Sequence, residues 1–190
     1  MDKIVCLELN QLRAKVEECV RCGLCRGRSR IVFGEGKENA EVMFVGEAPG
    51  YYEDIVGRPF VGKAGNLLTK MINSMNLKRE DVYVCNIIKC RPLCNRKPTP
   101  LEMESCLPFL KQQIDYIRPK VIVLLGASAY QGLFDSLEKI SVVEGVWKRY
   151  CGIAVMPTFH PAYVLRNPQC KRYVWRDLKL VMEKLHSGLF

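Results

Sequence analysis

Four short apolar runs, rich in valine and isoleucine, alternate along the chain with segments whose apolar residues recur every three or four positions. The runs cover residues 41–45, 82–88, 121–125 and 153–158, and their continuous hydrophobicity is typical of strands buried on both faces. The periodic segments cover residues 64–75, 100–117, 127–137 and 173–185 and predict amphipathic helices. The alternation predicts an α/β fold, a parallel sheet with helices on both sides.

A further periodic pattern precedes the first run. Leu9, Leu12, Val16 and Val20 are spaced by three and four residues and predict a short helix that leads into the first cysteines. No repeat, low-complexity tract or linker divides the 190 residues, so we expect a single domain over residues 1–190. The longest apolar run is far shorter than the ~20 residues that cross a bilayer, and the N-terminus lacks a secretory pattern, so we expect a soluble, unexported protein.

The composition narrows the class of partner. Hydrophobic residues make up 48% and charged residues 26% of the chain, which excludes general disorder and fibrous architectures. Lysine and arginine total 29 against 20 aspartate and glutamate, a formal net charge of +9. Such a surplus favours DNA, RNA or an anionic membrane surface as partner, without choosing among them.

Ligands of parallel α/β sheets bind beyond the carboxyl ends of the strands. Glycine-rich segments at residues 46–50 and 57–65 follow the first predicted strand, Asn86 ends the second, and residues 159–168 follow the fourth. The fold brings these segments to one rim, where we expect the functional site.

One of these segments imitates a phosphate-binding P-loop. Gly57, Gly62 and Lys63 have the P-loop spacing, but Ala64 stands where a serine or threonine hydroxyl binds Mg²⁺, and no strand immediately precedes the segment. A glycine-rich loop that admits a ligand against Phe60 fits the sequence better.

Two polar residues stand out at the predicted rim. His160 is one of only two histidines, and the other, His186, lies in a polar helical stretch typical of a surface. His160 has either a structural or a functional role. A buried amide at Asn86 must find hydrogen-bond partners, so it either braces a loop or reads the edge of a heterocycle with one donor and one acceptor.

The chain has ten cysteines, which in a reducing cytosol favour a metal site over disulfides. Cys19 and Cys22 form a ligand-type pair, and four thiolates from separated segments suit zinc or an iron–sulfur cluster. Spacing alone does not choose the metal or the ligands. The further candidate ligands are Cys90 and Cys106, and Cys25 and Cys94 are competing candidates. The remaining cysteines are by default small core or surface thiols: Cys6, Cys85, Cys151 and Cys170.

Six motifs, in this order, resemble the family 4 uracil-DNA glycosylases, the iron–sulfur group of thermophilic bacteria and archaea. They are VFGEG at 32–36, GEAPG at 46–50, ED at 53–54, GRPFVG at 57–62 with AG at 64–65, NIIKCRP at 86–92 with NR at 95–96, and HPAYVLRNP at 160–168. The resemblance extends from about residue 16 to residue 168, and the terminal helix is also expected. Any one motif is weak, and the set is highly specific.

The resemblance implies a three-layer α/β/α fold with a central four-stranded parallel sheet. It also implies a structural 4Fe–4S cluster in an N-terminal cluster-binding segment, which pins the first helix and the loop after Asn86 to the domain. Cys25 and Cys94 stay outside the cluster. The implied ligands are Cys19, Cys22, Cys90 and Cys106.

The implied activity is DNA repair: the enzyme flips uracil out of DNA and hydrolyses its N-glycosidic bond, leaving an abasic site. Phe60 stacks on uracil and Asn86 reads O4 and N3. Leu165 and Arg166, in the loop after the histidine, enter the duplex. The implied substrate-binding residues are Gly46, Ala48, Pro49, Gly50, Phe60 and Asn86.

Two side chains are expected to act on the reaction. His160 donates a hydrogen bond to uracil O2 and stabilises the departing anion. Family 1 enzymes position the attacking water with an aspartate where this loop has Ala48, so Glu47, one place earlier, is the nearest candidate. Alternatively, Glu47 only braces the loop.

We expect uracil-containing DNA, double- and single-stranded, as the partner of a monomer that binds no membrane and works in the cytoplasm of a prokaryote, at the nucleoid. A sliding-clamp contact is not readable from the sequence. Two other classes of function remain open at this stage, an iron–sulfur redox protein and a nonenzymatic nucleic-acid binder.

Overall fold

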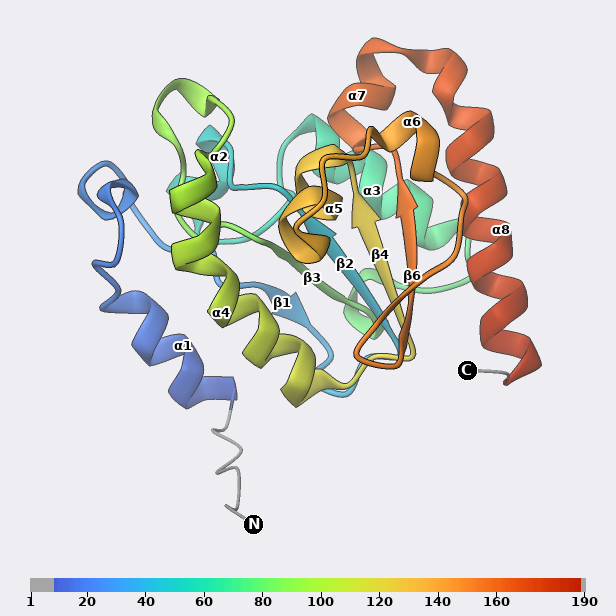
Figure 1. The fold of residues 1–190 in the computed structure, drawn as a ribbon, viewed down its shortest axis with the longest axis horizontal. Coiled ribbons are helices and arrows are strands. Elements are labelled where there is room, and N and C mark those ends of the chain that lie inside the picture. The colour runs from blue at the N-terminus through green and yellow to red at the C-terminus, as the bar shows by residue number, and fades with distance from the viewer. Residues whose placement is uncertain (1–8, 189–190) are drawn as a thin grey trace.

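The computed structural model describes residues 9–188 and contains a six-stranded sheet, in the order β1-β3-β2-β4-β6-β5, with helices on both faces (Figure 1). The four central strands run parallel. They correspond to the four apolar runs, and confirm the predicted α/β class with its parallel centre. These strands are β2 (Val42–Gly46), β3 (Tyr83–Asn86), β4 (Val121–Leu125) and β6 (Ile153–Thr158).

The two edge strands were not predicted, so the sheet has six strands where four were expected. β1 (Glu35–Gly36) pairs antiparallel with β3, and β5 (Lys148–Tyr150) pairs antiparallel with β6. Each is two or three residues long and contains no apolar run, because an edge strand is only partly covered.

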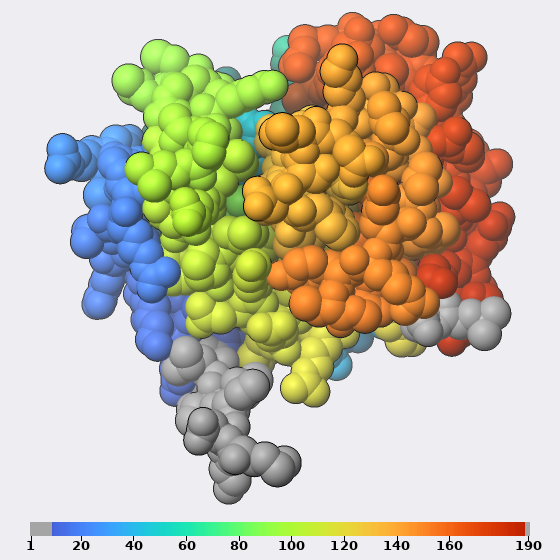
Figure 2. Space-filling model, in the orientation of Figure 1, coloured from blue at the N-terminus to red at the C-terminus, as the bar shows by residue number. Residues whose placement is uncertain are grey.

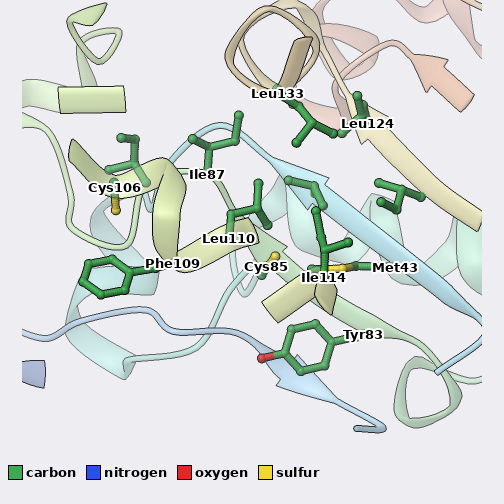
Figure 3. Packing of buried hydrophobic residues seen from close by; sticks show 14 of the residues in the cluster. Met43, Tyr83, Cys85, Ile87, Cys106, Phe109, Leu110, Ile114, Leu124 and Leu133 are labelled. Carbon is green, nitrogen blue, oxygen red and sulfur yellow. The ribbon is translucent and has the colours of Figure 1, made fainter. Parts of the chain in front are cut away.

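Side chains that alternate between the two faces of each central strand form two hydrophobic cores, one on each side of the sheet. Met43 and Val45 of β2 pack beneath α1 (Leu9–Glu17), α4 (Pro100–Ile117) and α5 (Ala127–Phe134), and Figure 3 shows the part of this core under α4. Val42 and Phe44 face α3 (Lys63–Asn73) and α8 (Lys171–Ser187). Because successive side chains of a strand point to opposite faces, both layers of helices pack on the same strand.

The longest predicted helix has the boundaries that its sequence specifies. Thr99 caps α4: its hydroxyl accepts from the N–H of Glu102, whose carboxylate accepts from the N–H of Thr99 at 2.8 Å. Pro100 occupies the first turn, where a missing N–H costs nothing. The predicted N-terminal helix is shorter than expected, since α1 ends at Glu17 and Val20 is exposed.

Several short helices were not predicted. The α-helical ones are α2 (Tyr51–Val56), α6 (Ile140–Val143) and α7 (Pro161–Arg166), and the 3₁₀ ones are η1 (Gly23–Arg26), η2 (Arg79–Asp81), η3 (Leu93–Asn95) and η4 (Pro168–Cys170). Leu165 and Arg166, expected in a loop, therefore end a helix. No helix in the described part of the chain is both long and apolar enough to span a membrane.

Candidate active site and cysteine pocket

A pocket of about 500 Å³ opens where the carboxyl ends of β2, β3 and β6 meet. The segment before α4 supplies another wall. In Figure 2 this segment (green) and the later part of the chain (orange and red) stand apart at the top of the molecule, with earlier residues (cyan) visible between them. The predicted site residues that line the pocket are Glu47, Ala48, Pro49, Gly50, Phe60, Asn86, His160 and Arg166.

Asn86 carries an unpaired acceptor in this pocket. The residue is only 2% exposed, and its Oδ1 has no hydrogen-bond partner among the described residues. Gly46 lies beside it on β2, and a Cβ there would come within 2.4 Å of Oδ1 and 2.5 Å of Phe60 Cζ. Glycine at 46 therefore keeps this space open. Since a buried acceptor without a partner is costly, the amide is arranged for something that enters the pocket.

Phe60 is held in an unusual backbone conformation. Its φ of 52° is left-handed, which is rare for a bulky residue, and the residue is 7% exposed. A Cβ at Gly65 would lie 1.7 Å from the Phe60 carbonyl oxygen, so only glycine lets α3 pack against this turn. The ring lies beside the imidazole of His160, with 5.6 Å between centroids and 30° between planes. Strain of this kind persists where the surroundings fix the residue.

The imidazole of His160 is oriented by the helix that it begins. Its Nδ1 accepts a hydrogen bond from the N–H of Ala162 at 3.1 Å, so the neutral ring carries its proton on Nε2. Burial, aided by the charge of Arg166 and opposed by that of Glu53, lowers the pKa of His160 to about 4. The side chain is therefore a neutral donor at physiological pH.

Two glutamates of the pocket differ in what they bind. Glu53 accepts from the N–H groups of Gly50, Val61 and Gly62 at 3.0 to 3.2 Å, and so ties together the two glycine-rich loops. Glu47 lines the pocket, and its carboxylate accepts no hydrogen bond from residues 9–188. From the sequence, Glu53 is the next candidate after Glu47 for positioning water, together with Asp54. Its position three residues after Gly50 is instead the spacing of a capping box.

These bonds limit two sequence interpretations. The N–H of Gly50 is engaged by Glu53, and Pro49 has none, so these two members of the predicted substrate loop offer no main-chain donor to a ligand. The N–H of Gly62 is engaged in the same way. In the segment that imitates a P-loop, the N–H groups of Val61 and Gly62 are thus occupied by a carboxylate and are not offered to a phosphate.

Exposed and basic residues surround the pocket mouth. Leu165 is 44% exposed near the end of α7, and Arg166 reaches the pocket without a hydrogen bond or ion pair to any described residue. On the opposite rim, Arg96 forms a two-pronged ion pair with Glu102 at 2.7 and 2.9 Å, which lowers the pKa of Glu102 to about 2. Lys97 lines the pocket beside it.

A second, smaller cavity gathers cysteines from the end of α1, from η1, from the segment after β3 and from α4. Arg28 donates from Nη1 to Cys90 Sγ at 3.2 Å, and the main-chain N–H of Lys89 donates to Cys106 Sγ at 3.4 Å. Cys94, exposed in η3, stays outside. The cavity is lined by Cys19, Cys22, Cys25, Cys90 and Cys106.

The remaining cysteines lie away from this cavity. Cys85 and Cys170 are buried and Cys151 is exposed, whereas Cys6 lies outside the described residues. In the part of the chain that is described, no three His, Cys, Asp or Glu side chains are placed to hold a metal ion. The cysteine cavity therefore has the thiol donors of a metal centre, but not the tight grouping that a single ion requires.

Comparisons with known proteins identify the family of the chain. The profile of the Uracil DNA glycosylase superfamily matches residues 33–179. The chain is similar to the type-4 uracil-DNA glycosylase of Saccharolobus solfataricus, with 44% identity over 94% of this chain and 87% of that protein. It is similar to those of Thermotoga maritima, with 46% identity over 87% and 88%, and Archaeoglobus fulgidus, with 43% identity over 92% of each. The chain belongs to the uracil DNA glycosylase superfamily.

Proposed function

We propose that this protein excises uracil from DNA by hydrolysing the N-glycosidic bond, so that free uracil leaves and an abasic site remains. Several curated relatives that match more than four fifths of the chain are named type-4 uracil-DNA glycosylases. A base inside a duplex is inaccessible, so the enzyme must first flip the nucleotide into its pocket.

The observation that carries the proposal is the unpaired oxygen of Asn86. Uracil offers an N3–H to this oxygen and its O4 to the amide NH₂. Cytosine has no proton on N3 and an amino donor at position 4, so both contacts fail. Phe60 supplies an apolar face against which a planar base stacks, in a pocket whose floor Gly46 keeps free.

His160 stabilises the uracil anion as the bond to the sugar breaks. Its Nδ1 is occupied by Ala162, which leaves Nε2–H as the donor to uracil O2. The lowered pKa keeps the ring neutral, so Nδ1 remains an acceptor for the N–H of Ala162 and the one ring proton stays on Nε2. A donor aimed at developing negative charge in such a site contributes a factor of ~10²–10³ to the rate.

Glu47 positions the attacking water. Its carboxylate is free of protein hydrogen bonds in the described structure, while both oxygens of Glu53 are engaged by main-chain N–H groups. The alternative in which Glu47 braces its loop loses support, since Glu53 does the bracing.

DNA is held at the pocket mouth. The net charge of +9 favours phosphate contacts, and Arg166 at the mouth has no competing partner among residues 9–188. Leu165 inserts into the duplex in place of the flipped nucleotide. A monomer suffices, because one chain supplies the whole pocket, and both single- and double-stranded DNA of a prokaryotic nucleoid are substrates.

The cysteine cavity holds a 4Fe–4S cluster through Cys19, Cys22, Cys90 and Cys106. Bound there, the group supplies structural cross-linking of α1, the segment after β3, and α4. The N–H donors to the sulfurs of Cys90 and Cys106 suit anionic thiolate ligands.

Release of uracil tests the proposed activity. The purified protein is incubated with an end-labelled duplex that contains one U, and alkali then cleaves any abasic site. We expect a single cleavage product at the U position and none from a duplex with T there. A protein that binds both duplexes and cleaves neither is a nonenzymatic binder.

A further inference from the structure

Lys89 is completely buried, and it forms no ion pair within residues 9–188. Its Nζ donates to the carbonyl oxygen of Asn86 and to Oε1 of Gln113, both at 2.6 Å. Lysine is rarely buried to this extent unless its amine is engaged. The position is therefore built for these two hydrogen bonds.

The bond to Asn86 replaces a missing strand. β1 pairs only with Tyr83 and Val84, so within the described part of the chain the outer edge of β3 has no strand partner at Asn86. On the inner edge, the N–H of Ile87 donates to the Gly46 carbonyl of β2. Because a trans peptide points its C=O and N–H in opposite directions, the Asn86 carbonyl faces the unpaired edge, where Lys89 reaches it.

Gln113 holds the lysine in place from α4. Its amide is fully buried, accepts from Lys89, and donates to the Phe33 carbonyl at 2.9 Å and to the Tyr83 hydroxyl at 3.1 Å. All of these partners are buried, so the network has little freedom to relax.

The same residue contacts the cysteine cavity. The main-chain N–H of Lys89 donates to Cys106 Sγ, its carbonyl accepts from the N–H of Val32 at 2.8 Å, and Cys90 follows it directly in the chain. The segment from Asn86 to Cys90 is thus fixed at one end by the base pocket and at the other by the cysteines.

We propose that Lys89 is a positioning residue that couples the two pockets. Its side chain holds the main chain of Asn86 so that the Asn86 side-chain amide faces the edge of the base, while its own main chain supports the cysteine cluster. The inference rests on the proposed role of Asn86 in reading uracil. It assigns to Lys89 no contact with substrate.

A double-mutant cycle separates this role from a general effect on folding. Lys89→Met keeps the length and apolar stem and removes the donor. It is combined with Asn86→Ala, and single-turnover excision of U is measured with enzyme in excess. Ile114→Ala, a core change one residue from Gln113 on α4, is the matched destabilised control. The rate of iron release to a chelator is the readout that does not depend on activity.

We expect Lys89→Met to slow excision at least tenfold in the parent and less than threefold in the Asn86→Ala background, because its effect passes through Asn86. Ile114→Ala should act equally in both backgrounds. Iron release from Lys89→Met should be at least threefold faster than from Ile114→Ala. The inference is overturned if Lys89→Met has equal effects in both backgrounds, or if it releases iron no faster than the control. In either case an active parent still upholds the proposed function. A parent that releases no uracil overturns both.

Discussion

The base pocket and the cysteine cavity differ in how far their polar atoms are already satisfied. In the base pocket, Asn86 Oδ1 and the carboxylate of Glu47 have no partner among the described residues. In the cysteine cavity, the sulfurs of Cys90 and Cys106 accept N–H donors from the protein itself. The first arrangement suits a ligand that enters and leaves, and the second suits a group that stays.

The same contrast separates residues within the base pocket. Glu53 and Arg96 carry charges as conspicuous in the sequence as those of Glu47 and Arg166, yet they are engaged by main-chain N–H groups and by Glu102. An engaged charge shapes the pocket, and a free one is available for chemistry or for DNA.

Loss of a cluster ligand should have the largest effect, because it removes a cross-link between three segments. Wild-type protein should contain about four irons per chain, with broad absorbance near 400 nm. Cys106→Ala should lose iron and soluble expression. Cys25→Ala, in the same cavity, should retain four irons, and loss of iron from this variant would make Cys25 a ligand. A colourless protein with one zinc contradicts the assignment.

His160→Ala should slow single-turnover excision by ~10²–10³ while binding of uracil DNA changes little, because the donor acts on the departing anion. A His186→Gln variant serves as control, since it removes the other histidine. A loss confined to binding would contradict the role.

Glu47→Gln should lower the rate of the chemical step by roughly tenfold to a hundredfold, since a water-positioning carboxylate contributes part of the gain of general base catalysis. Its melting temperature should stay near that of the wild type. Glu53→Gln should instead lower the melting temperature, because hydrogen bonds to a charged group contribute about 1.5–3 kcal/mol. The reverse pattern would exchange the two roles.

Arg166→Ala should weaken activity several-fold on duplex DNA and less on single strands, since only the duplex needs a base held out of its stack. The slope of log K against log salt should also become shallower by about 0.9, the contribution of one phosphate contact. Equal losses on both substrates would leave Arg166 with no role in holding the flipped state.

The titration of His160 is the prediction with the smallest expected effect, and it reports on this one side chain. In His186→Gln protein a single histidine remains, and its NMR shifts should titrate near pH 4 and not near 6.5. The folded-state pKa lies below the unfolded one, so the stability that this histidine contributes is present above about pH 6.5 and is lost as pH falls toward 4. A midpoint near 6.5 would mean an imidazole in contact with solvent.

The sequence predicted those parts of the fold whose causes are local. Uninterrupted Val and Ile runs located the four central strands, and the spacing of apolar residues located α4 over residues 100–117. The edge strands β1 and β5 could not be found this way, because they are short and polar and form only through pairing with β3 and β6.

The site was predictable in part for the same reason. Strand ends brought Asn86 and His160 to one rim, as expected from a parallel sheet. The engagement of Glu53 by Val61 and Gly62, and of Lys89 by Gln113 at a separation of 24 residues, depends on packing that no local pattern encodes.

The central claim is that the unpaired amide of Asn86 selects uracil. Single-turnover excision from matched duplexes with U or C at one position tests it most directly, in wild-type and Asn86→Asp enzymes. Each mismatched buried polar group costs ~1–3 kcal/mol, so the wild type should prefer U by several hundredfold or more. A carboxylate accepts from the cytosine amino group but offers no donor to O4, so Asn86→Asp should lose most activity on U and gain weak activity on C. An Asn86→Asp enzyme with the wild-type rate and preference for U would contradict the account.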